Sequence, residues 1–269
     1  MREVVFPGLN LKVLFSNILF SIGNINIYWY SVLIVFSIII ALIGMKKENG
    51  KYGINYDDIL QLLIFLIPIS FICARIYYVI FKLGYYIKEP IQILNIRNGG
   101  LAIYGGIIGG ILFILVYCKI KKINILNMLD FISPYLAIGQ SIGRWGNFLN
   151  VEAYGSKTNN IFRMGIIENG KYIEVHPTFL YESIATLLIF LILMFFRNKR
   201  KYKGQLTLIY FTSYCFIRTS IEELRKDSLM IGVFRISQIV SIIIFVICFS
   251  VLFYKNIIER NKKYAKTRV

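Results

Sequence analysis

Acidic residues, histidine and charge in general are scarce in this 269-residue sequence. It contains 14 aspartate and glutamate residues against 31 lysines and arginines, one histidine, and only 17% charged residues altogether. Charged residues make up about a quarter of an average soluble domain, so this deficit argues against an ordinary soluble protein. Hydrophobic residues make up 57% of the chain and the mean hydropathy is +0.64, which favours an integral membrane protein.

Cysteine is also sparse, and its four residues lie in or at the ends of apolar segments: Cys73, Cys118, Cys215 and Cys248. No pair of them has CxxC spacing, so the pattern indicates neither a disulfide framework nor a zinc site. We interpret all four as small buried hydrophobic residues.

The sequence has no internal repeat, low-complexity linker or second soluble domain, so we expect residues 1–269 to form a single membrane-embedded domain. Several apolar runs reach the ~20 residues that cross a hydrocarbon core of ~30 Å. They predict an all-α polytopic integral membrane protein with about seven transmembrane helices. No small-residue cleavage site follows the short apolar run after Lys12, so we keep the N-terminus in the mature protein. The predicted spans are 27–45, 59–81, 100–118, 125–142, 177–196, 205–221 and 236–254.

The net charge of +17 is concentrated between the apolar runs and at the C-terminus. This distribution is typical of the positive-inside bias and not of a basic face on a folded domain, so we expect no nucleic acid partner. Anionic lipid headgroups are the partner that so basic a surface favours.

The dense basic connections follow the first, third, fifth and last predicted spans. The positive-inside rule therefore predicts a cytoplasmic C-terminus and an N-terminus outside. The longer connections, 10–26 and 150–176, contain fewer basic residues and then face outward. We expect them to form interfacial helices or a small extracytoplasmic cap.

Ionisable residues at membrane depth cost ~2.5–3.5 kcal/mol each and mark functional sites. Those in or at the ends of predicted spans are Arg75, Asp130, Arg144, Glu182 and Arg218. Tyr214, Arg218 and Glu222 recur at i, i+4 and i+8, so they share one helix face. They form either an internal ion pair or a cation held for an anionic headgroup. Their spacing does not decide between these two interpretations.

Three further features can be interpreted from the sequence: Arg75, a glycine run and the only histidine. Arg75 suits a structural clamp, with Asp130 as a candidate ion-pair partner. The glycine run 99–110 contains two overlapping GxxxG spacings, which suit close helix packing or a broken helix whose amides face a ligand phosphate. The only histidine, His176, precedes Pro177 at the entrance of the fifth predicted span. It is either a structural residue or a proton acceptor that titrates near neutral pH.

The densest polar run near the membrane covers residues 143–155 and reads GRWGNFLNVEAYG. It places a cation, two amides and a carboxylate within nine residues, which packing alone explains poorly: Arg144, Asn147, Asn150 and Glu152. The run resembles the signature of the bacterial prolipoprotein diacylglyceryl transferases, G-R-x-G-N-F-x-N-x-E-x-x-G, at every fixed position.

The resemblance extends in order over almost the whole chain. Its other segments are Phe15-Ser16, Tyr28-Trp29-Tyr30, Arg75-Ile-Tyr-Tyr-Val, the glycine-rich 99–106, His176-Pro-Thr-Phe-Leu-Tyr-Glu182, and the set Tyr214, Arg218 and Glu222. Two positions depart from the family pattern. Tyr104 stands where many members have histidine, and a phenol is a poor base near neutral pH. Ser237 replaces the glycine that precedes glutamine in the last family motif.

The resemblance implies transfer of diacylglyceryl from phosphatidylglycerol to the lipobox cysteine thiol of a prolipoprotein signal peptide. The products are a thioether and glycerol phosphate. The expected location is the outer leaflet of the bacterial cytoplasmic (inner) membrane, in a multi-pass protein. Phosphatidylglycerol, prolipoprotein signal peptides and membrane lipids are the implied partners, and no metal or organic cofactor is implied.

A phosphate ester leaving group calls for arginines, so we assign Arg144 and Arg218 to a phosphate clamp. The other expected site residues are the positioning donors Asn147 and Asn150, the arginine-orienting Glu152 and Glu222, the headgroup-shaping Tyr30, Tyr104 and Tyr214, and Gly99, Gly100, Gly105, Gly106 and Gly155. Gly155 permits a tight turn or a close lipid approach. The thiol needs a base, for which His176, Glu152 and a substrate phosphate oxygen all stay open.

A secondary transporter for a small anion is the alternative from another class, with Arg75, Arg144 and Arg218 lining a site at the midplane. The short chain and the lack of duplicated halves argue against it. A purely structural scaffold does not explain so many polar residues at membrane depth.

Overall fold

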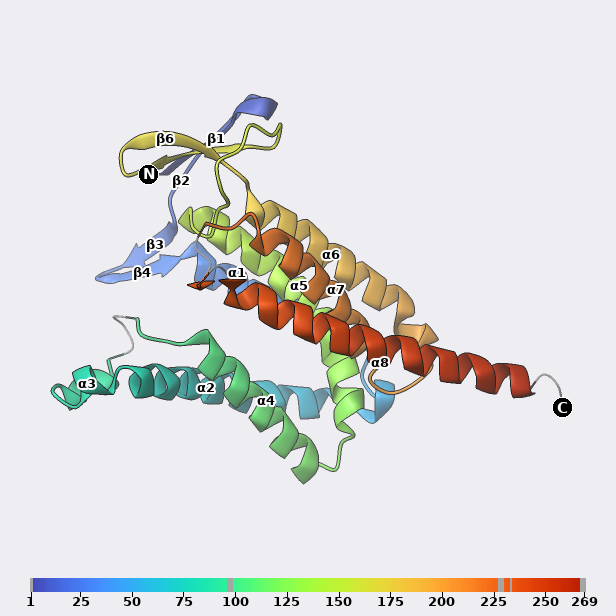
Figure 1. Ribbon diagram of the computed structural model, residues 1–269. Helices are drawn as coiled ribbons and strands as arrows, with labels where there is room; N and C mark the ends of the chain where they lie inside the picture. The colour runs from blue at the N-terminus through green and yellow to red at the C-terminus, as the bar shows by residue number, and fades with distance from the viewer. Residues whose placement is uncertain (1, 96–98, 227–229, 233, 267–269) are drawn as a thin grey trace. The chain divides into compact units, whose positions relative to one another are not determined.

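The computed structural model describes residues 2–95, 99–226, 230–232 and 234–266, and the chain is mostly helical (Figure 1). The long helices are α1 (Trp29–Lys47), α2 (Tyr56–Phe81), α4 (Ile103–Ile120), α5 (Ile125–Asn150), α6 (Thr178–Phe196), α7 (Gln205–Glu222) and α8 (Ile236–Lys266). The short ones are η1 (Pro7–Leu9), η2 (Lys51–Gly53), α3 (Leu83–Tyr86), η3 (Pro90–Ile93) and η4 (Arg197–Lys199). A long helix therefore stands at each position where the sequence predicts a span.

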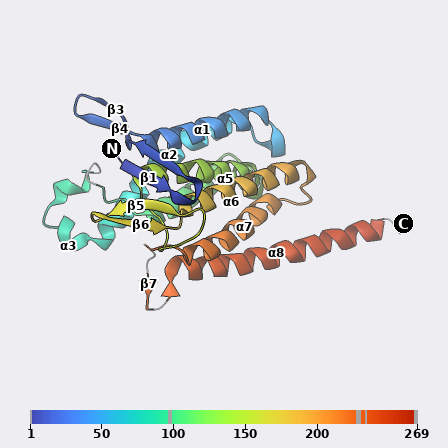
Figure 2. The same cartoon turned by 90° about the horizontal axis from the view of Figure 1, so that it is seen from above.

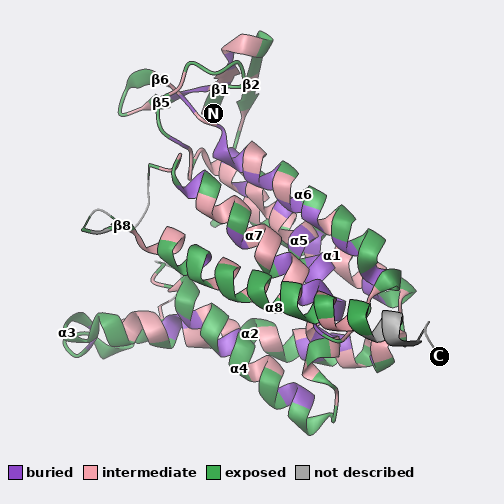
Figure 3. Cartoon of the chain, turned by 45° about the vertical axis from the view of Figure 1, so that its right-hand side comes forward, coloured by how far each residue is buried: buried purple, intermediate pink, exposed green. Residues whose placement is uncertain are grey.

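Five helices of the described chain are long and apolar enough to cross a membrane: α1, α2, α4, α6 and α8. Many of their large apolar residues are exposed, and Figure 3 colours much of α8 as exposed. Such exposure is expected where the bilayer supplies an apolar surrounding. Helices α5 and α7 are more polar, and many of their polar side chains are buried. The expectation of a mostly helical membrane protein is confirmed, and the number of seven spans stays a prediction.

The all-α expectation is wrong for the two long connections, which form strands and not interfacial helices. The strands are β1 (Arg2–Phe6), β2 (Leu11–Phe15), β3 (Ile18–Ile22), β4 (Ile25–Tyr28), β5 (Met164–Glu168), β6 (Lys171–Val175), β7 (Met230–Ile231) and β8 (Phe234–Arg235). One sheet has the order β2-β1-β5-β6, with all neighbours antiparallel, and β3-β4 and β7-β8 are separate hairpins.

Local sequence explains why strands form here. Asn169 and Gly170 separate β5 from β6 and both have positive φ, as a two-residue hairpin turn requires. Asn-Gly between apolar strands is a strong hairpin signal. Val5 of β1 then pairs with Gly165 of β5, so residues far apart in sequence lie side by side (Figure 2).

The sheet has a small core that reaches the ends of two helices. Its buried members are Val4, Phe6, Phe148, Met164, Ile166, Val175 and Phe179. Phe148 lies near the end of α5 and Phe179 near the start of α6, and their rings stack with centroids 4.7 Å apart. The sheet therefore fixes the helix ends that carry the polar signature.

The chain divides into two compact units. The first comprises residues 1–44 and 132–269 and contains the sheet, with α6, α7 and α8. The second comprises residues 45–131 and contains α2 and α4, which pack closely because a Cβ on Gly105 or Gly109 would meet Cys73 of α2 within 2.6 Å. Of the two interpretations of the glycine run, close helix packing explains Gly105 and Gly109. The single-domain expectation stays a prediction.

Candidate functional site

A buried carboxylate on α6 is the centre of an arginine cluster in the first unit. The side chain of Glu182 is only 4% exposed, and its Oε2 lies 2.5 Å from Nη2 of Arg144 on α5. Its Oε1 lies 3.3 Å from Nη1 of Arg218 on α7 and 3.5 Å from Nη1 of Arg225. One acidic side chain thus collects three arginines from separate parts of the unit.

A second carboxylate completes the cluster. Oε2 of Glu222 lies 2.5 Å from Nη2 of Arg218, which is the i, i+4 pair expected from the sequence. The hydroxyl of Ser237 donates to the other oxygen of Glu222, and Arg235 donates to its main-chain carbonyl. Arg144, Arg218 and Arg225 therefore converge on Glu182 and Glu222, and a cluster of guanidinium groups suits an anion.

The amides of the signature connect this cluster to a second carboxylate-centred group. Oδ1 of Asn147 accepts from Arg144 at 3.4 Å, and its Nδ2 donates to Oε1 of Glu152 at 2.9 Å. Asn150 donates to the same oxygen at 3.3 Å. Glu152 therefore orients the two amides, while Glu182 takes the role of orienting Arg144 that we expected of Glu152.

The backbone around Glu152 is strained. Val151 and Ala153 have φ of 50° and 55°, a region that a β-branched residue rarely occupies. The Glu152 amide donates to the Asn147 carbonyl at 3.0 Å. Thr178 donates to the carbonyl of Ala153 at 2.5 Å. Such strain costs ~1–3 kcal/mol per residue and typically occurs where function fixes a side chain.

Two glycines of the signature are required by close packing inside the protein. A Cβ on Gly146 would lie 2.0 Å from the Tyr30 ring, so this glycine lets the ring pack on α5. A Cβ on Gly155 would lie 2.6 Å from the Cβ of His176. Gly155 does not have a positive φ, and its close approach is to the protein's own chain.

Hydrogen bonds between α5 and α6 hold the paired arginine and carboxylate in register. The indole Nε1 of Trp145 donates to the Ser183 hydroxyl at 3.1 Å. The hydroxyls of Ser141 and Ser183 each donate to the other's carbonyl at 2.9 Å. Each helix thus fixes the residue next to Arg144 or Glu182, so the rotation of both helices is set.

His176 lies just before α6. Its Nδ1 lies 3.3 Å from the Tyr181 hydroxyl, and the two rings meet edge to face. Burial lowers the pKa of His176, which favours the neutral imidazole and makes it a weaker base than an exposed histidine.

A cavity of about 400 Å³ adjoins the signature. Arg2, at the start of β1, donates to the carbonyl of Asn150 at the end of α5 and so adds a cation to the cavity wall. The cavity is lined by Arg2, Asn17, Tyr28, Tyr30, Ser31, Asn150 and Glu152. Hydroxyls, amides and both signs of charge are therefore available to a polar substrate.

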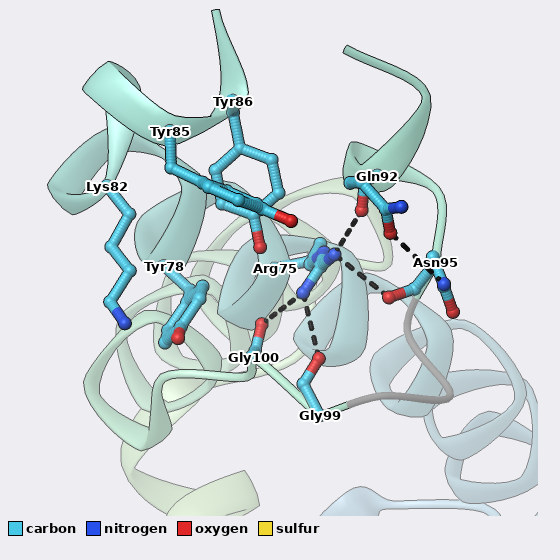
Figure 4. Close-up of a pocket in the computed structure, with 9 residues that line it drawn as sticks. All are labelled: Arg75, Tyr78, Lys82, Tyr85, Tyr86, Gln92, Asn95, Gly99 and Gly100. Carbon is cyan, nitrogen blue, oxygen red and sulfur yellow. Dashed lines mark hydrogen bonds between the residues drawn. The ribbon is translucent and has the colours of Figure 1, made fainter. Parts of the chain in front are cut away.

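In the second unit, Arg75 is a structural clamp (Figure 4). Its Nε donates to the Ile93 carbonyl at 2.9 Å, and Nη1 donates to the carbonyls of Gly99 and Gly100 at 2.9 and 2.8 Å. Its Nη2 donates to the carbonyls of Gln92 and Asn95 at 2.6 and 3.0 Å. Every guanidinium N–H is thereby used. The pairing of Arg75 with Asp130 that the sequence left open is not formed.

The structure distributes the expected site residues over both units. The first unit holds Tyr30, Arg144, Asn147, Asn150, Glu152, Gly155, His176, Tyr214, Arg218 and Glu222, and the second holds Gly99, Gly100, Tyr104, Gly105 and Gly106. Tyr214 stacks on Tyr210 with ring centroids 5.8 Å apart.

Sequence reasoning did not give Glu182, Arg225 or Ser237 a role at the site. Arg225 follows Glu222 by three residues, a helical spacing that could have drawn notice. Nothing in the sequence joins Glu182 to Arg144, because 38 residues and a change of helix separate them.

Known proteins resemble this chain over most of its length. The sequence profile of the family described as prolipoprotein diacylglyceryl transferase matches residues 17–254. The phosphatidylglycerol–prolipoprotein diacylglyceryl transferase of Clostridioides difficile is 47% identical over 228 residues, which cover 85% of this chain and 90% of the relative. The protein of the same name from Finegoldia magna is 44% identical over 251 residues, covering 92% of this chain and 100% of the relative. That of Listeria monocytogenes is 41% identical, with 90% of each chain covered.

Proposed function

This chain belongs to the family of the prolipoprotein diacylglyceryl transferases, and from that premise we propose how it performs the reaction. It transfers the diacylglyceryl group of phosphatidylglycerol to the lipobox cysteine thiol of a prolipoprotein, the first step in bacterial lipoprotein maturation. A thioether forms, the glycerol C–O bond to phosphate breaks, and glycerol phosphate leaves. We assign the site from one observation: the buried carboxylate of Glu182 contacts three arginines.

The arginine cluster binds the phosphate of phosphatidylglycerol. Arg144 and Arg218 each keep N–H groups that no carboxylate of the described residues occupies, and guanidinium groups recognise phosphate oxygens in pairs. Negative charge develops on the leaving phosphate as the C–O bond breaks. Arginines that Glu182 and Glu222 already hold in place stabilise that charge without reorganising, which is the larger part of their effect on the rate.

The groups around Glu152 position the reactants. Asn147 and Asn150 fix this carboxylate beside the cavity that Tyr30 lines. The incoming thiol must lose its proton to react as a thiolate. His176, Glu152 and a phosphate oxygen of the substrate are the candidate acceptors. In this chain Tyr104 cannot be the base, and we assign it and Tyr214 to hydrogen bonds with the headgroup.

We assign the glycines of residues 99–106 to the phosphatidylglycerol site as well. The clamp on Arg75 supports this role, because it fixes the main chain of Gly99 and Gly100 immediately before α4. Fixed backbone amides at the start of a helix favour a phosphate. Gly155, in the first unit, packs beside His176, which is one of the candidate proton acceptors.

We place the protein in the bacterial cytoplasmic membrane with seven spans, including the more polar α5 and α7. The N-terminus lies outside and the C-terminus in the cytoplasm. The pairing of β1 with β5 supports this topology, because it joins the N-terminal stretch to the connection 150–176, both of which the charge pattern assigns to the outer side. They form the extracytoplasmic cap of one membrane-embedded domain.

Substitution of Arg144 tests the clamp. Purified protein, phosphatidylglycerol and a lipobox peptide should give a diacylglyceryl-modified peptide, detected by mass spectrometry. Arg144→Ala should lower kcat/KM by about 100-fold or more, the usual effect of losing one group that stabilises developing charge. Arg163→Ala removes an equal charge from a partly exposed pair with Glu174 and should retain activity.

Two outcomes would contradict the proposal in different ways. Full turnover by a folded Arg144→Ala variant would refute the clamp. Absence of transfer by the wild-type protein would refute the function and favour the anion transporter.

A further inference from the structure

The β3-β4 hairpin ahead of α1 contains no charged residue. The sequence from residue 13 to residue 45 has no lysine, arginine, aspartate or glutamate, and both strands lie within it. By contrast, the outer strands of the four-stranded sheet carry Lys12 in β2 and Lys171 in β6. Charge on an outer strand discourages pairing with another chain. The β3-β4 hairpin lacks that protection.

The hairpin also exposes an apolar surface on the first unit. The hydroxyl of Ser21 donates to Oδ1 of Asn26 at 2.7 Å, and these two residues are paired across the hairpin. Two polar side chains of the strands therefore satisfy each other. The large hydrophobic residues that the hairpin exposes are Leu19, Phe20, Ile22, Ile25 and Tyr28.

The outer edges of the hairpin carry main-chain hydrogen-bonding groups. In the part of the chain that the structure describes, this sheet has two strands and no third strand beside it. Each strand directs alternate main-chain groups away from its partner. One of the main-chain N–H groups, that of Ile18, donates to the hydroxyl of Ser16 at 3.1 Å. The edges are otherwise open to a strand from another chain.

The position of the hairpin makes an added strand favourable. Strand β4 ends at Tyr28, and the candidate span α1 starts at the next residue, so the hairpin projects from the end of a membrane helix (Figures 1 and 2). Tyrosine and tryptophan at this junction are typical of a membrane interface. Unpaired main-chain groups are costly in apolar surroundings, because water does not satisfy them there. A third strand would remove that cost.

The base of the hairpin adjoins the cavity at the signature. Asn17, immediately before β3, and Tyr28, at the end of β4, both line the cavity of about 400 Å³ that Glu152 also lines. The carbonyl of Asn17 accepts a hydrogen bond from the main-chain N–H of Trp29 at 3.0 Å, which closes the base. A strand added to the hairpin therefore has one end at this cavity.

We propose that the signal-peptide segment immediately before the reacting cysteine binds as a third strand on the β3-β4 hairpin. This inference rests on the proposed function, which makes a prolipoprotein the acceptor. The segment follows the apolar part of a signal peptide, so it suits an uncharged apolar surface. Its extended main chain supplies the hydrogen bonds that the hairpin edge lacks. The cysteine at the end of the added strand then lies in the cavity beside Glu152.

N-methylation of the peptide main chain tests this pairing with the full-length wild-type protein. Lipobox peptides that are methylated at one main-chain nitrogen each, in the four residues before the cysteine, would be compared in the transfer assay at saturating phosphatidylglycerol. Only alternate N–H groups of a strand face its neighbour. Methylation at every second position should therefore raise the KM for the peptide by about 5-fold or more, through loss of one hydrogen bond. Methylation at the positions between should leave this KM unchanged.

Ile25→Lys tests the protein side of the same contact. It replaces an apolar contact by a charge on β4 and should raise the KM for the peptide by about 10-fold, with the KM for phosphatidylglycerol unchanged. Leu14→Lys is the matched control, because Leu14 is 60% exposed and Ile25 is 61% exposed, and β2 is an outer strand of the other sheet. Its KM for the peptide should equal that of the wild type.

Equal KM values for all the methylated peptides would overturn the added strand, as would equal effects of Ile25→Lys and Leu14→Lys. A higher KM for phosphatidylglycerol in Ile25→Lys would assign the hairpin to lipid contact and overturn the proposal. A wild-type dimer that Ile25→Lys separates, measured by native mass spectrometry, would assign the edge to a second copy and also overturn it. Absence of transfer to the unmethylated peptide is a different result, because it refutes the proposed function itself.

Discussion

Replacing Glu182 by glutamine tests the centre of the arginine cluster. Glutamine keeps the size of the side chain and one acceptor oxygen, but it removes the charge that faces Arg144, Arg218 and Arg225. Removing one partner of a buried ion pair typically costs ~3–5 kcal/mol. Glu222 still neutralises Arg218 in the variant, and the arginines are partly exposed, so we expect a loss near ~3 kcal/mol in the stability of the first unit.

The same substitution should separate the two kinetic constants. Without Glu182 the guanidinium groups lose a competing anion, so KM for phosphatidylglycerol should not rise. They also lose their fixed orientation, and kcat should fall by about 100-fold, equal to ~2.7 kcal/mol of transition-state stabilisation. The assay is peptide modification at varied phosphatidylglycerol, combined with thermal unfolding in the same detergent.

Glu174→Gln provides the matched control, because Glu174 pairs with Arg163 at 2.6 Å where both side chains are about a third exposed. Its stability loss should be ~1 kcal/mol or less. The reasoning fails if Glu182→Gln unfolds at the wild-type temperature with an unchanged kcat. A rise in KM alone would place Glu182 in substrate binding and not in the orientation of arginines.

Two further predictions concern packing and pH. Gly146→Ala should place a methyl group against the Tyr30 ring, lower the stability of the fold by ~1–3 kcal/mol and abolish transfer. A Cβ added at Gly143 would have no other atom within 4 Å, so Gly143→Ala should leave thermal unfolding and transfer unchanged. A hydrogen bond from Lys226 holds the pKa of Glu168 below its usual range, so the stability from this exposed pair is present above the ordinary glutamate pKa and is lost as the pH falls through the lowered value. Lys226→Gln should therefore lower the unfolding temperature near pH 7, and the decrease should become smaller as the pH falls below the ordinary glutamate pKa; a decrease that does not change with pH would disprove the linkage.

Apolar run length predicted the positions of the long helices well, because a membrane helix needs ~20 apolar residues and little else. It did not predict which helices would be polar. The pattern at Arg218 and Glu222 predicted their ion pair, since both lie on one helix where spacing fixes distance. The strands of the two long connections were not predicted, although Asn169-Gly170 between apolar residues is a hairpin signal.

The remaining site could not be predicted, because its contacts join separate elements. Glu182 meets Arg144 only after α5 and α6 pack through Trp145 and Ser183. The partners of Arg75 are main-chain carbonyls, which every residue type carries, so no residue pattern marks them.

The pairing of β1 with β5 has a consequence for the order of events during synthesis. Val5 can pair with Gly165 only after Gly165 has been synthesised. A ribosome that adds roughly 5–20 residues per second needs roughly 8–30 s to make the residues between them. During that interval β1 has only β2 as a neighbour, and the core around Phe148 lacks the side chains of β5 and β6. The core that holds the end of α5 is therefore complete only after β5 and β6 have been made. A chain that stalls before Gly165 carries the whole signature but lacks the strands that pack against the end of α5.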